Sequence, residues 1–173
     1  YLTENADHVI IQTPYVICNG YMYDVLQGIS DHAKLQIVLN AVEKGSNPWG
    51  CTDYLNQKKK ILETGADVYE LMNDYPVHTK AVLINDRLSV VGSYNLDMRS
   101  TYLDTELMLV IDSEKLSQQI HETESDYMEK SKEVLANGQE TEGAKYQGKV
   151  LNRKKKLYYG VLRIIIRPLR QLL

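Results

Sequence analysis

Short apolar runs rich in β-branched residues, separated by stretches of helical spacing, constrain the fold of this 173-residue chain more than any other feature. Three such runs have the length and composition of buried strands: residues 8–13, 35–39 and 66–71. Helical spacing of apolar side chains predicts helices between them, over residues 21–29 and 53–64. The second helix is expected to stop at Gly65, as a C-cap glycine would end it. Strands that alternate with helices in this way predict an α/β fold with a layered sheet flanked by helices.

The second half of the chain predicts a hairpin followed by a strand and a long helix. Apolar residues 80–84 and 88–91 are expected to form two strands joined by the turn Asn85-Asp86-Arg87. Residues 103–111 predict a further strand, and Ser113 is placed to cap a helix that runs to about Ala136. We therefore expect one folded domain over residues 1–136, because 173 residues are enough for one hydrophobic core and are too few for two.

Charge is distributed unevenly along the sequence. Residues 1–148 hold 12 Lys or Arg and 23 Asp or Glu, a net charge of −11, whereas residues 149–173 hold eight basic residues and no acid. An acidic body argues against a nucleic-acid partner, since such binding depends on neutralising phosphates. A polar, Gly-rich loop at residues 137–149 leads to a basic C-terminal helix at residues 150–173. This helix is expected either to pack on the domain or to face an anionic membrane.

Other features bear on location. Cys18 and Cys51 are too few for a disulfide framework and lack metal-ligand spacing, so reduced thiols in a cytoplasmic protein are expected. No run is long and apolar enough to span a bilayer. The sequence opens at Tyr1 and enters a strand without a signal peptide, as a piece of a longer protein would. We expect a cytoplasmic protein, or one peripheral at the inner face of the cell membrane, whose preceding part could carry an anchor.

One segment concentrates chemically useful side chains. His78 and Lys80 are two residues apart at the start of a predicted strand, so their side chains leave on the same face. The following strand ends in Gly92-Ser93-Tyr94-Asn95, and glycine lets the backbone approach a ligand closely. An imidazole, an ammonium, a hydroxyl and an amide converging on one point suit a phosphate group. Each half of this pattern occurs often by chance, but the two in order, joined by apolar strands, are far less accidental.

His78-x-Lys80 followed by Gly92-Ser93-x-Asn95 resembles the HKD signature of the phospholipase D superfamily. The next residues, Leu96 to Ser100, resemble the bacterial cardiolipin synthase branch, and similarity to the family extends over about residues 8–135. The sequence departs from the family where an Asp follows the Lys after four residues, because that position is Asn85. We expect Asn85 to support the turn through Asx-type hydrogen bonds.

The resemblance implies a phospholipase D-like sheet that forms one half of a two-signature pseudo-dimer. It implies a phosphohistidine intermediate and requires no metal or cofactor. In this scheme His78 is the general acid and base, and Lys80 and Asn95 bind phosphoryl oxygens. Ser93 and Gly92 support them, and Glu106 corresponds to a family acid that orients a catalytic imidazole; the alternative for Glu106 is an ordinary surface glutamate. Three residues lie on loops expected to reach the mouth of the site: Tyr15, Asn40 and Trp49. Packing in the core or exposure to solvent is the expected role of each, and contact with a substrate is the alternative.

The favoured activity is cardiolipin synthesis from two phosphatidylglycerol molecules with release of glycerol. Alternatives are lipid hydrolysis of the phospholipase D type, a homodimeric nuclease with one signature per chain, and a non-catalytic scaffold. The expected partners are a phospholipid substrate, an anionic membrane surface and a second HKD half, either upstream in the same polypeptide or in a second copy. The remaining histidines have no supporting partners in sequence and are interpreted as structural or surface residues: His8, His32 and His121.

Overall fold

A computed structural model describes residues 1–172 and the side chains of residues 1–170. Its strands are β1 (His8–Gln12), β2 (Val16–Ile17), β3 (Lys34–Asn40), β4 (Asp67–Leu71), β5 (Ala81–Ile84), β6 (Leu88–Gly92), β7 (Leu96–Asp97), β8 (Met108–Asp112), β9 (Ser131–Val134) and β10 (Glu140–Glu142). Its helices are α1 (Gly20–Ser30), α2 (Pro48–Glu63), α3 (Met98–Tyr102), α4 (Glu114–Glu129), α5 (Arg153–Ile165) and the 3-10 helix η1 (Arg167–Leu172).

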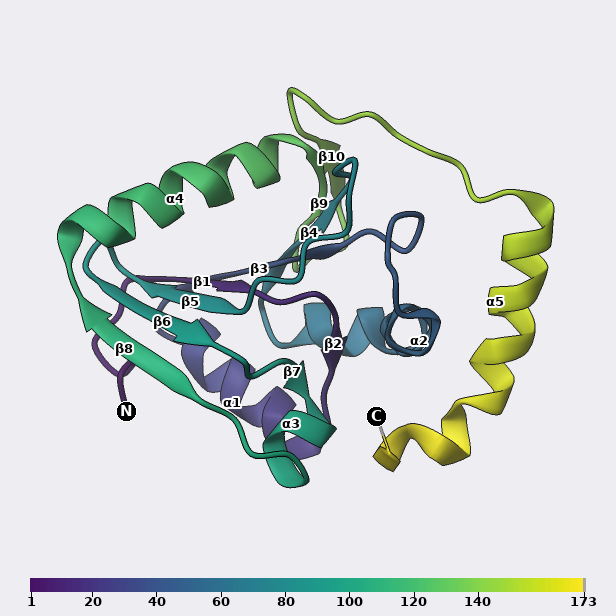
Figure 1. Ribbon diagram of the computed structural model, residues 1–173, viewed down its shortest axis with the longest axis horizontal. Helices are drawn as coiled ribbons and strands as arrows, with labels where there is room; N and C mark the ends of the chain where they lie inside the picture. The colour runs from purple at the N-terminus through teal and green to yellow at the C-terminus, as the bar shows by residue number, and fades with distance from the viewer. Residues whose placement is uncertain (173) are drawn as a thin grey trace.

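The centre of the molecule is a mixed sheet in the order β10-β9-β4-β3-β1-β5-β6-β8, and β2 and β7 form a separate short ladder (Figure 1). Strands β4, β3 and β1 are parallel, and all other neighbours in the large sheet are antiparallel. Gln12, at the end of β1, lies opposite Ala81, at the start of β5. The carboxyl ends of the parallel strands therefore lie at the same end of the sheet as the start of β5 and the end of β6.

Alternation of side chains along the strands produces two hydrophobic layers, one on each face of the sheet. On one face, Val9 and Ile37 pack in the cluster that includes Met22 of α1 and Tyr54 of α2. On the other face, Ile10, Val38 and Leu83 pack beneath α4. The central strands are thus buried on both sides, which explains why their sequences are continuous apolar runs.

The predicted α/β fold is confirmed, and the boundaries of most predicted elements agree with it. Helix α2 begins earlier than expected, at Pro48, because the side chain of Asn47 caps it by accepting hydrogen bonds from the backbone of Trp49 and Gly50. Gly65 follows its end at φ +87°, a conformation that favours glycine, as the expected C-cap requires.

The prediction of a helix over residues 113–136 was wrong in its second part. Ser113 does cap α4 and accepts a hydrogen bond from the Leu116 N–H, but α4 ends at Glu129. Residues 131–134 form β9, which pairs with β4 and buries Ser131 and Val134. The conformation of residues 131–134 is therefore determined by pairing with β4 and not by their own helical propensity.

Two other predictions need correction for similar reasons. Residues 103–111 do not form one strand, because Asp97 caps the short helix α3 and β8 begins only at Met108. The expected loop at residues 137–149 contains β10, which returns along β9 through a turn at Asn137 and Gly138. An Asn-Gly pair is a hairpin signal, and the polar composition around it obscured the strand.

The C-terminal helix packs against the domain through one of its sides. Tyr159, Leu162 and Ile166 are buried, and α5 lies against α2. Arg170 forms an ion pair with buried Asp53 at 2.5 Å, and its guanidinium also donates to the Cys18 carbonyl. Within residues 1–172, no helix combines the length and the apolar character that crossing a bilayer requires.

The two cysteines are buried free thiols on separate elements. Burial raises the pKa of Cys18 to about 12 and that of Cys51 to about 11. Thiols with such pKa values are poor nucleophiles at neutral pH. Neither side chain is therefore suited to covalent catalysis.

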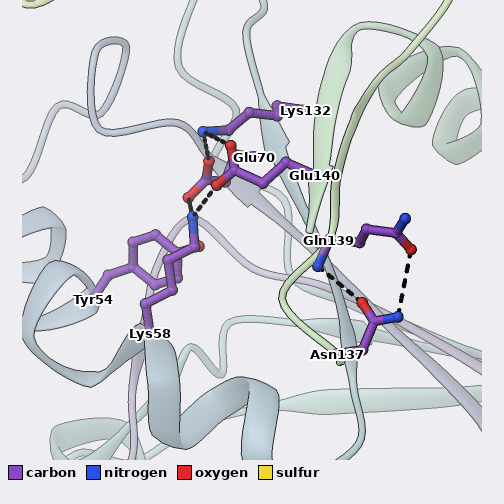
Figure 2. Close-up of polar contacts among 7 residues, drawn as sticks. All are labelled: Tyr54, Lys58, Glu70, Lys132, Asn137, Gln139 and Glu140. Carbon is purple, nitrogen blue, oxygen red and sulfur yellow. Dashed lines mark hydrogen bonds and ion pairs between the residues drawn. The ribbon is translucent and has the colours of Figure 1, made fainter. Parts of the chain in front are cut away.

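A buried carboxylate ties the hairpin of β9 and β10 to the domain (Figure 2). Glu70 of β4 accepts a hydrogen bond from the Tyr54 hydroxyl at 2.7 Å and forms ion pairs with Lys58 and Lys132 at 2.7 and 3.0 Å. Both lysines also contact Glu140 of β10. Burial by itself would raise the pKa of Glu70, but the two lysines and the tyrosine together hold it below its usual value.

Replacing Glu70 by Gln should lower the free energy of unfolding at neutral pH by about 2–3 kcal/mol, because two partly buried lysines lose a charged partner. Since the folded-state pKa is depressed, this stabilisation exists above the ordinary carboxyl pKa and is lost as pH falls through the folded-state value. Urea unfolding of both proteins at several pH values measures the difference. Glu63→Gln, which disrupts an exposed pair with Lys59, is the matched control and should change the free energy by less than about 0.5 kcal/mol. Equal effects of the two substitutions would contradict the argument.

Candidate active site

His78 and Lys80 lie at the sheet edge where β5 begins, and their side chains are in direct contact. The Lys80 Nζ lies 2.5 Å from His78 Nδ1 and also donates to the His78 carbonyl at 2.7 Å. His78 is exposed, whereas Lys80 is 91% buried, with a relative exposure of 9%. An ammonium that donates to Nδ1 requires the neutral imidazole to carry its proton on Nε2. In this resting arrangement Nδ1 is occupied by Lys80, and the exposed ring carries its proton on Nε2.

The surroundings lower the pKa of both groups. Burial and the neighbouring positive charge of Lys80 lower the pKa of His78 below its usual value. Burial likewise lowers the pKa of Lys80, although the carboxylates of Glu106 and Asp97 partly offset this effect. At neutral pH the pair is therefore a cationic lysine beside a neutral imidazole.

Gly92 ends β6 at a point where the backbone of the next strand comes very close. A Cβ at this position would lie 2.0 Å from the Leu107 carbonyl oxygen, so no other residue fits without moving the strand. Ser93 follows, and its hydroxyl accepts a hydrogen bond from the Leu107 N–H and donates one to the Glu106 carboxylate. The serine thus links the end of β6 to the segment that enters β8.

Glu106 lies among hydrogen-bond donors near Lys80. Hydrogen bonds from Ser93 and Ser100, together with the charge of Lys80, hold the pKa of this carboxyl below its usual value. The carboxylate accepts from the Ser93 hydroxyl, while Nδ1 of His78 is occupied by Lys80. The role of orienting a catalytic imidazole stays a prediction, because the chain alone places no imidazole on this carboxylate.

Asn95 is held by groups that the motif itself did not identify. Its backbone N–H and its side-chain amide both donate to the Ser100 hydroxyl, at 3.3 and 3.4 Å. Ser100 is fixed in turn by Asp97, whose buried carboxylate accepts from the Ser100 N–H at 2.6 Å. Asn95 Oδ1 is buried and without a hydrogen-bond partner among the described atoms. The Asp97-x-x-Ser100 spacing is a helix-capping pattern and was the available sequence signal.

Asn40 is buried, as the packing interpretation of this residue requires. It is only 6% exposed, and its amide donates to the carbonyls of Pro14 and Val77 and accepts from the Val77 N–H at 2.8 Å. These bonds use both ends of the amide, so Asn40 fixes the loop that precedes His78 instead of facing a ligand.

Tyr15 and Trp49 lie near the same edge of the sheet. The Tyr15 ring packs against Gly50, where an added Cβ would lie 2.8 Å from it. Burial and the carboxylate of Asp97 raise the pKa of Tyr15. Trp49, in the first turn of α2, is 39% exposed. Contact of either residue with a substrate stays a prediction.

Asn85 supports the hairpin differently from the expected Asx turn. It adopts the left-handed conformation, φ 51°, and its Oδ1 accepts hydrogen bonds from the backbone of Asp7 and His8 at 3.0 and 3.1 Å. The side chain therefore attaches the hairpin of β5 and β6 to the start of β1. A carboxylate oxygen would accept the same bonds, which explains why Asn can stand where the phospholipase D superfamily has Asp.

The other histidines lie away from this edge. His8 starts β1, bonds Gln36 at 2.6 Å and stacks edge-on against His121 of α4, while His32 contacts the Thr3 carbonyl. These contacts agree with their interpretation as structural or surface residues. Among the described residues, no group of three or more His, Cys, Asp or Glu side chains is arranged to hold a metal ion.

Comparison with known proteins identifies the family. The pattern described as "Cardiolipin synthase, PLD-like domain" matches residues 1–126, so the chain belongs to the phospholipase D-like cardiolipin synthase family. It is 30% identical to cardiolipin synthase A of Proteus mirabilis over 150 residues, which cover 84% of this chain and 29% of that protein. Cardiolipin synthase A of Serratia proteamaculans is 28% identical over 152 residues, or 85% and 29% of the two chains. The chain thus spans less than a third of the length of these relatives.

Solved structures agree on the fold. Phosphatidylserine synthase of Haemophilus influenzae superposes with a TM-score of 0.69 at 16% identity, covering 99% of this chain and 43% of that one. The phospholipase D family member Nuc from Salmonella typhimurium superposes with a TM-score of 0.63, also at 16% identity, over 76% and 85% of the two chains. The predicted phospholipase D-like sheet flanked by helices is therefore confirmed.

The contact between Lys80 and His78 makes a prediction about titration. In the 173-residue chain, His78 should titrate below the usual imidazole pKa of about 6.5, and Lys80→Met should raise its pKa by removing the adjacent charge. NMR titration of the imidazole Cε1–H signals measures both values. Lys59→Met, at an exposed lysine on α2, should leave the His78 titration unchanged. A wild-type His78 that titrates at or above the usual value would contradict the described site.

Proposed function

We propose that this chain supplies one half of the active site of a phosphatidyltransferase that makes cardiolipin from phosphatidylglycerol. The observation that carries this proposal is the contact of Lys80 with His78 beside the Asn95 turn, in a chain of the cardiolipin synthase family. A buried ammonium next to an exposed imidazole can hold a phosphodiester oxygen while the imidazole exchanges a proton with an alcohol.

The proposed reaction has two displacements at phosphorus. An imidazole of the second half attacks phosphorus, a P–N bond forms, and the bond from phosphorus to the glycerol oxygen breaks. With Lys80 drawn from Nδ1 to a phosphoryl oxygen, His78 takes up a proton from solvent, and the resulting imidazolium gives its Nε2 proton to the departing alkoxide as glycerol leaves. The neutral His78 now keeps its remaining proton on Nδ1. Its Nε2 takes the proton of an incoming phosphatidylglycerol hydroxyl, whose oxygen forms a new P–O bond as the P–N bond breaks. Charge on the phosphoryl oxygens is balanced by Lys80 and by amide donors such as Asn95.

A second imidazole must come from another half, because this chain places only one at the site. It has four histidines, and the other three pair elsewhere. We propose that the second half lies in the same polypeptide, since the curated relatives are more than three times as long as the matched region. A second copy of this chain is the alternative source, and it would form a symmetric site.

The proposed substrate is a phospholipid, and the proposed location is the surface of a membrane. The net charge of −11 on residues 1–148 makes a nucleic acid an unfavourable substrate, because its phosphates would be repelled. Cardiolipin synthesis and lipid hydrolysis use the same residues and differ in which hydroxyl reaches the intermediate. Mass spectrometry of the lipid products separates them, since transfer gives cardiolipin and hydrolysis gives phosphatidic acid.

Substitution of the motif residues tests the proposal in the full-length protein. Lys80→Ala should lower turnover of phosphatidylglycerol by about 10²–10³-fold, because a preorganised charge at the phosphoryl oxygens is lost. Lys59→Ala, at an exposed lysine away from the site, should leave the rate unchanged. Lipid products are quantified by mass spectrometry over time. Unchanged cardiolipin formation by a folded Lys80→Ala protein would exclude the assignment.

The role of His78 has its own test. If His78 protonates the leaving group, then His78→Ala should slow turnover of phosphatidylglycerol by about 10²–10⁴-fold. It should slow release of p-nitrophenol from a phosphatidyl p-nitrophenyl ester much less, because that leaving group departs without a proton. Steady-state rates with both substrates give the comparison. Equal losses would show that His78 is the nucleophile and not the acid.

A further inference from the structure

Helix α5 has two apolar sides, and only one of them is covered by the domain. Tyr159 and Leu162, on the inner side, are at most 7% exposed. Leu157, Val161 and Ile164 are 71, 51 and 71% exposed. Their spacing of four and three residues places them in one line along the helix, the outer stripe. A surface helix normally buries a single apolar stripe and keeps its other side polar. The outer stripe therefore has no role in folding the described chain.

Positive charge borders the outer stripe, and negative charge is absent from this end of the sequence. Residues 149–173 contain eight Lys or Arg and no Asp or Glu. The side chains of residues 153–156 are all exposed, and none takes part in an ion pair described for this chain. Lys156 directly precedes Leu157 in α5, and Arg167, at the start of η1, is also exposed. Apolar side chains lined by free cations form a surface complementary to an anionic, apolar partner.

We propose that the outer stripe of α5 is a docking surface for an anionic phospholipid bilayer. Leu157, Val161 and Ile164 would enter the boundary between headgroups and acyl chains, while Lys154 and Lys156 would meet lipid phosphates. Charge favours this partner, because every ionised side chain of residues 149–173 is basic. A second copy of the chain is the rival occupant, since its acidic body is also negative, and the oligomeric state is therefore part of the test.

The attachment of this segment connects such a surface to the site. Helix η1 packs against α3, which follows residues 92–95 of the motif after the short strand β7. Arg170 adds the ion pair to Asp53 of α2. A bilayer bound at α5 would therefore hold the domain in a defined orientation. Vesicle binding requires no turnover, so an experiment on vesicle binding tests the docking surface independently of the proposed reaction.

Vesicle co-sedimentation with the 173-residue chain tests the outer stripe. Wild type should bind vesicles of phosphatidylcholine and phosphatidylglycerol in equal amounts much more strongly than vesicles of phosphatidylcholine alone. Leu157→Ser/Ile164→Ser should weaken binding to the anionic vesicles by at least about ten-fold, because two large apolar side chains no longer enter the bilayer. Tyr21→Ser/Val25→Ser, which removes two exposed apolar residues from α1, is the matched control and should bind like wild type. Circular dichroism checks that every variant is folded.

A charge variant tests the other half of the proposal. Lys154→Gln/Lys156→Gln should weaken binding by about five-fold for each lysine and reduce its salt dependence, since each basic residue near an anionic surface contributes about 1 kcal/mol. Lys59→Gln/Lys60→Gln, at exposed lysines of α2, should have no effect. Equal binding by wild type and the stripe variant would overturn the proposal. So would a molecular mass in light scattering that is doubled for wild type and single for the stripe variant, because the stripe would then join two copies.

Discussion

The buried side chain of Asn40 holds together the two loops on which the site depends. Strands β1 and β4 end near the site, and one loop leads from β1 to β2 while another leads from β4 to β5. Asn40 links these loops by bonding the backbone of Pro14 in one loop and Val77 in the other. Tyr15 and His78 each follow directly after one of these anchored residues. Because one amide fixes both loops, displacement of either would move the candidate catalytic groups together.

Other short polar side chains near the site also bond backbone groups that lack a partner in the sheet. Thr13 donates its hydroxyl to the Tyr15 carbonyl and accepts from the Leu96 N–H, which joins the end of β1 to the motif turn. Ser93 and Asp97 each accept hydrogen bonds from backbone N–H groups in the same region. Short polar side chains thus satisfy backbone groups where regular pairing stops. The result is a backbone around the candidate site that is fixed before any ligand arrives, and such preorganisation is a condition for stabilising charge that develops during a reaction.

Local patterns predicted the core strands and the motif, because these depend on side-chain order along short segments. Composition could not predict β9, since residues 131–134 become a strand only when β4 offers an edge. Likewise, the sequence left contact of Asn40 with a substrate open as an alternative. The fold instead encloses its side chain between two loops that are distant in sequence. Glu106 shows the remaining difficulty, because its expected imidazole partner is not supplied by the part of the chain that the structure describes. Tertiary pairing and assembly decide these features, and no window of sequence contains them.

The contact between Lys80 and His78 suits an imidazole that must first donate a proton and then accept one. Without substrate, burial and the adjacent ammonium keep His78 neutral. A bound phosphodiester anion would offset the charge of Lys80, and the pKa of His78 would rise toward the range in which it can protonate an alkoxide. Once the first product leaves, the imidazole is neutral and ready to accept the proton of the second alcohol. In the proposed reaction, contact between the two residues would therefore couple the protonation state of His78 to occupancy of the phosphate site, so that one side chain could serve both displacements.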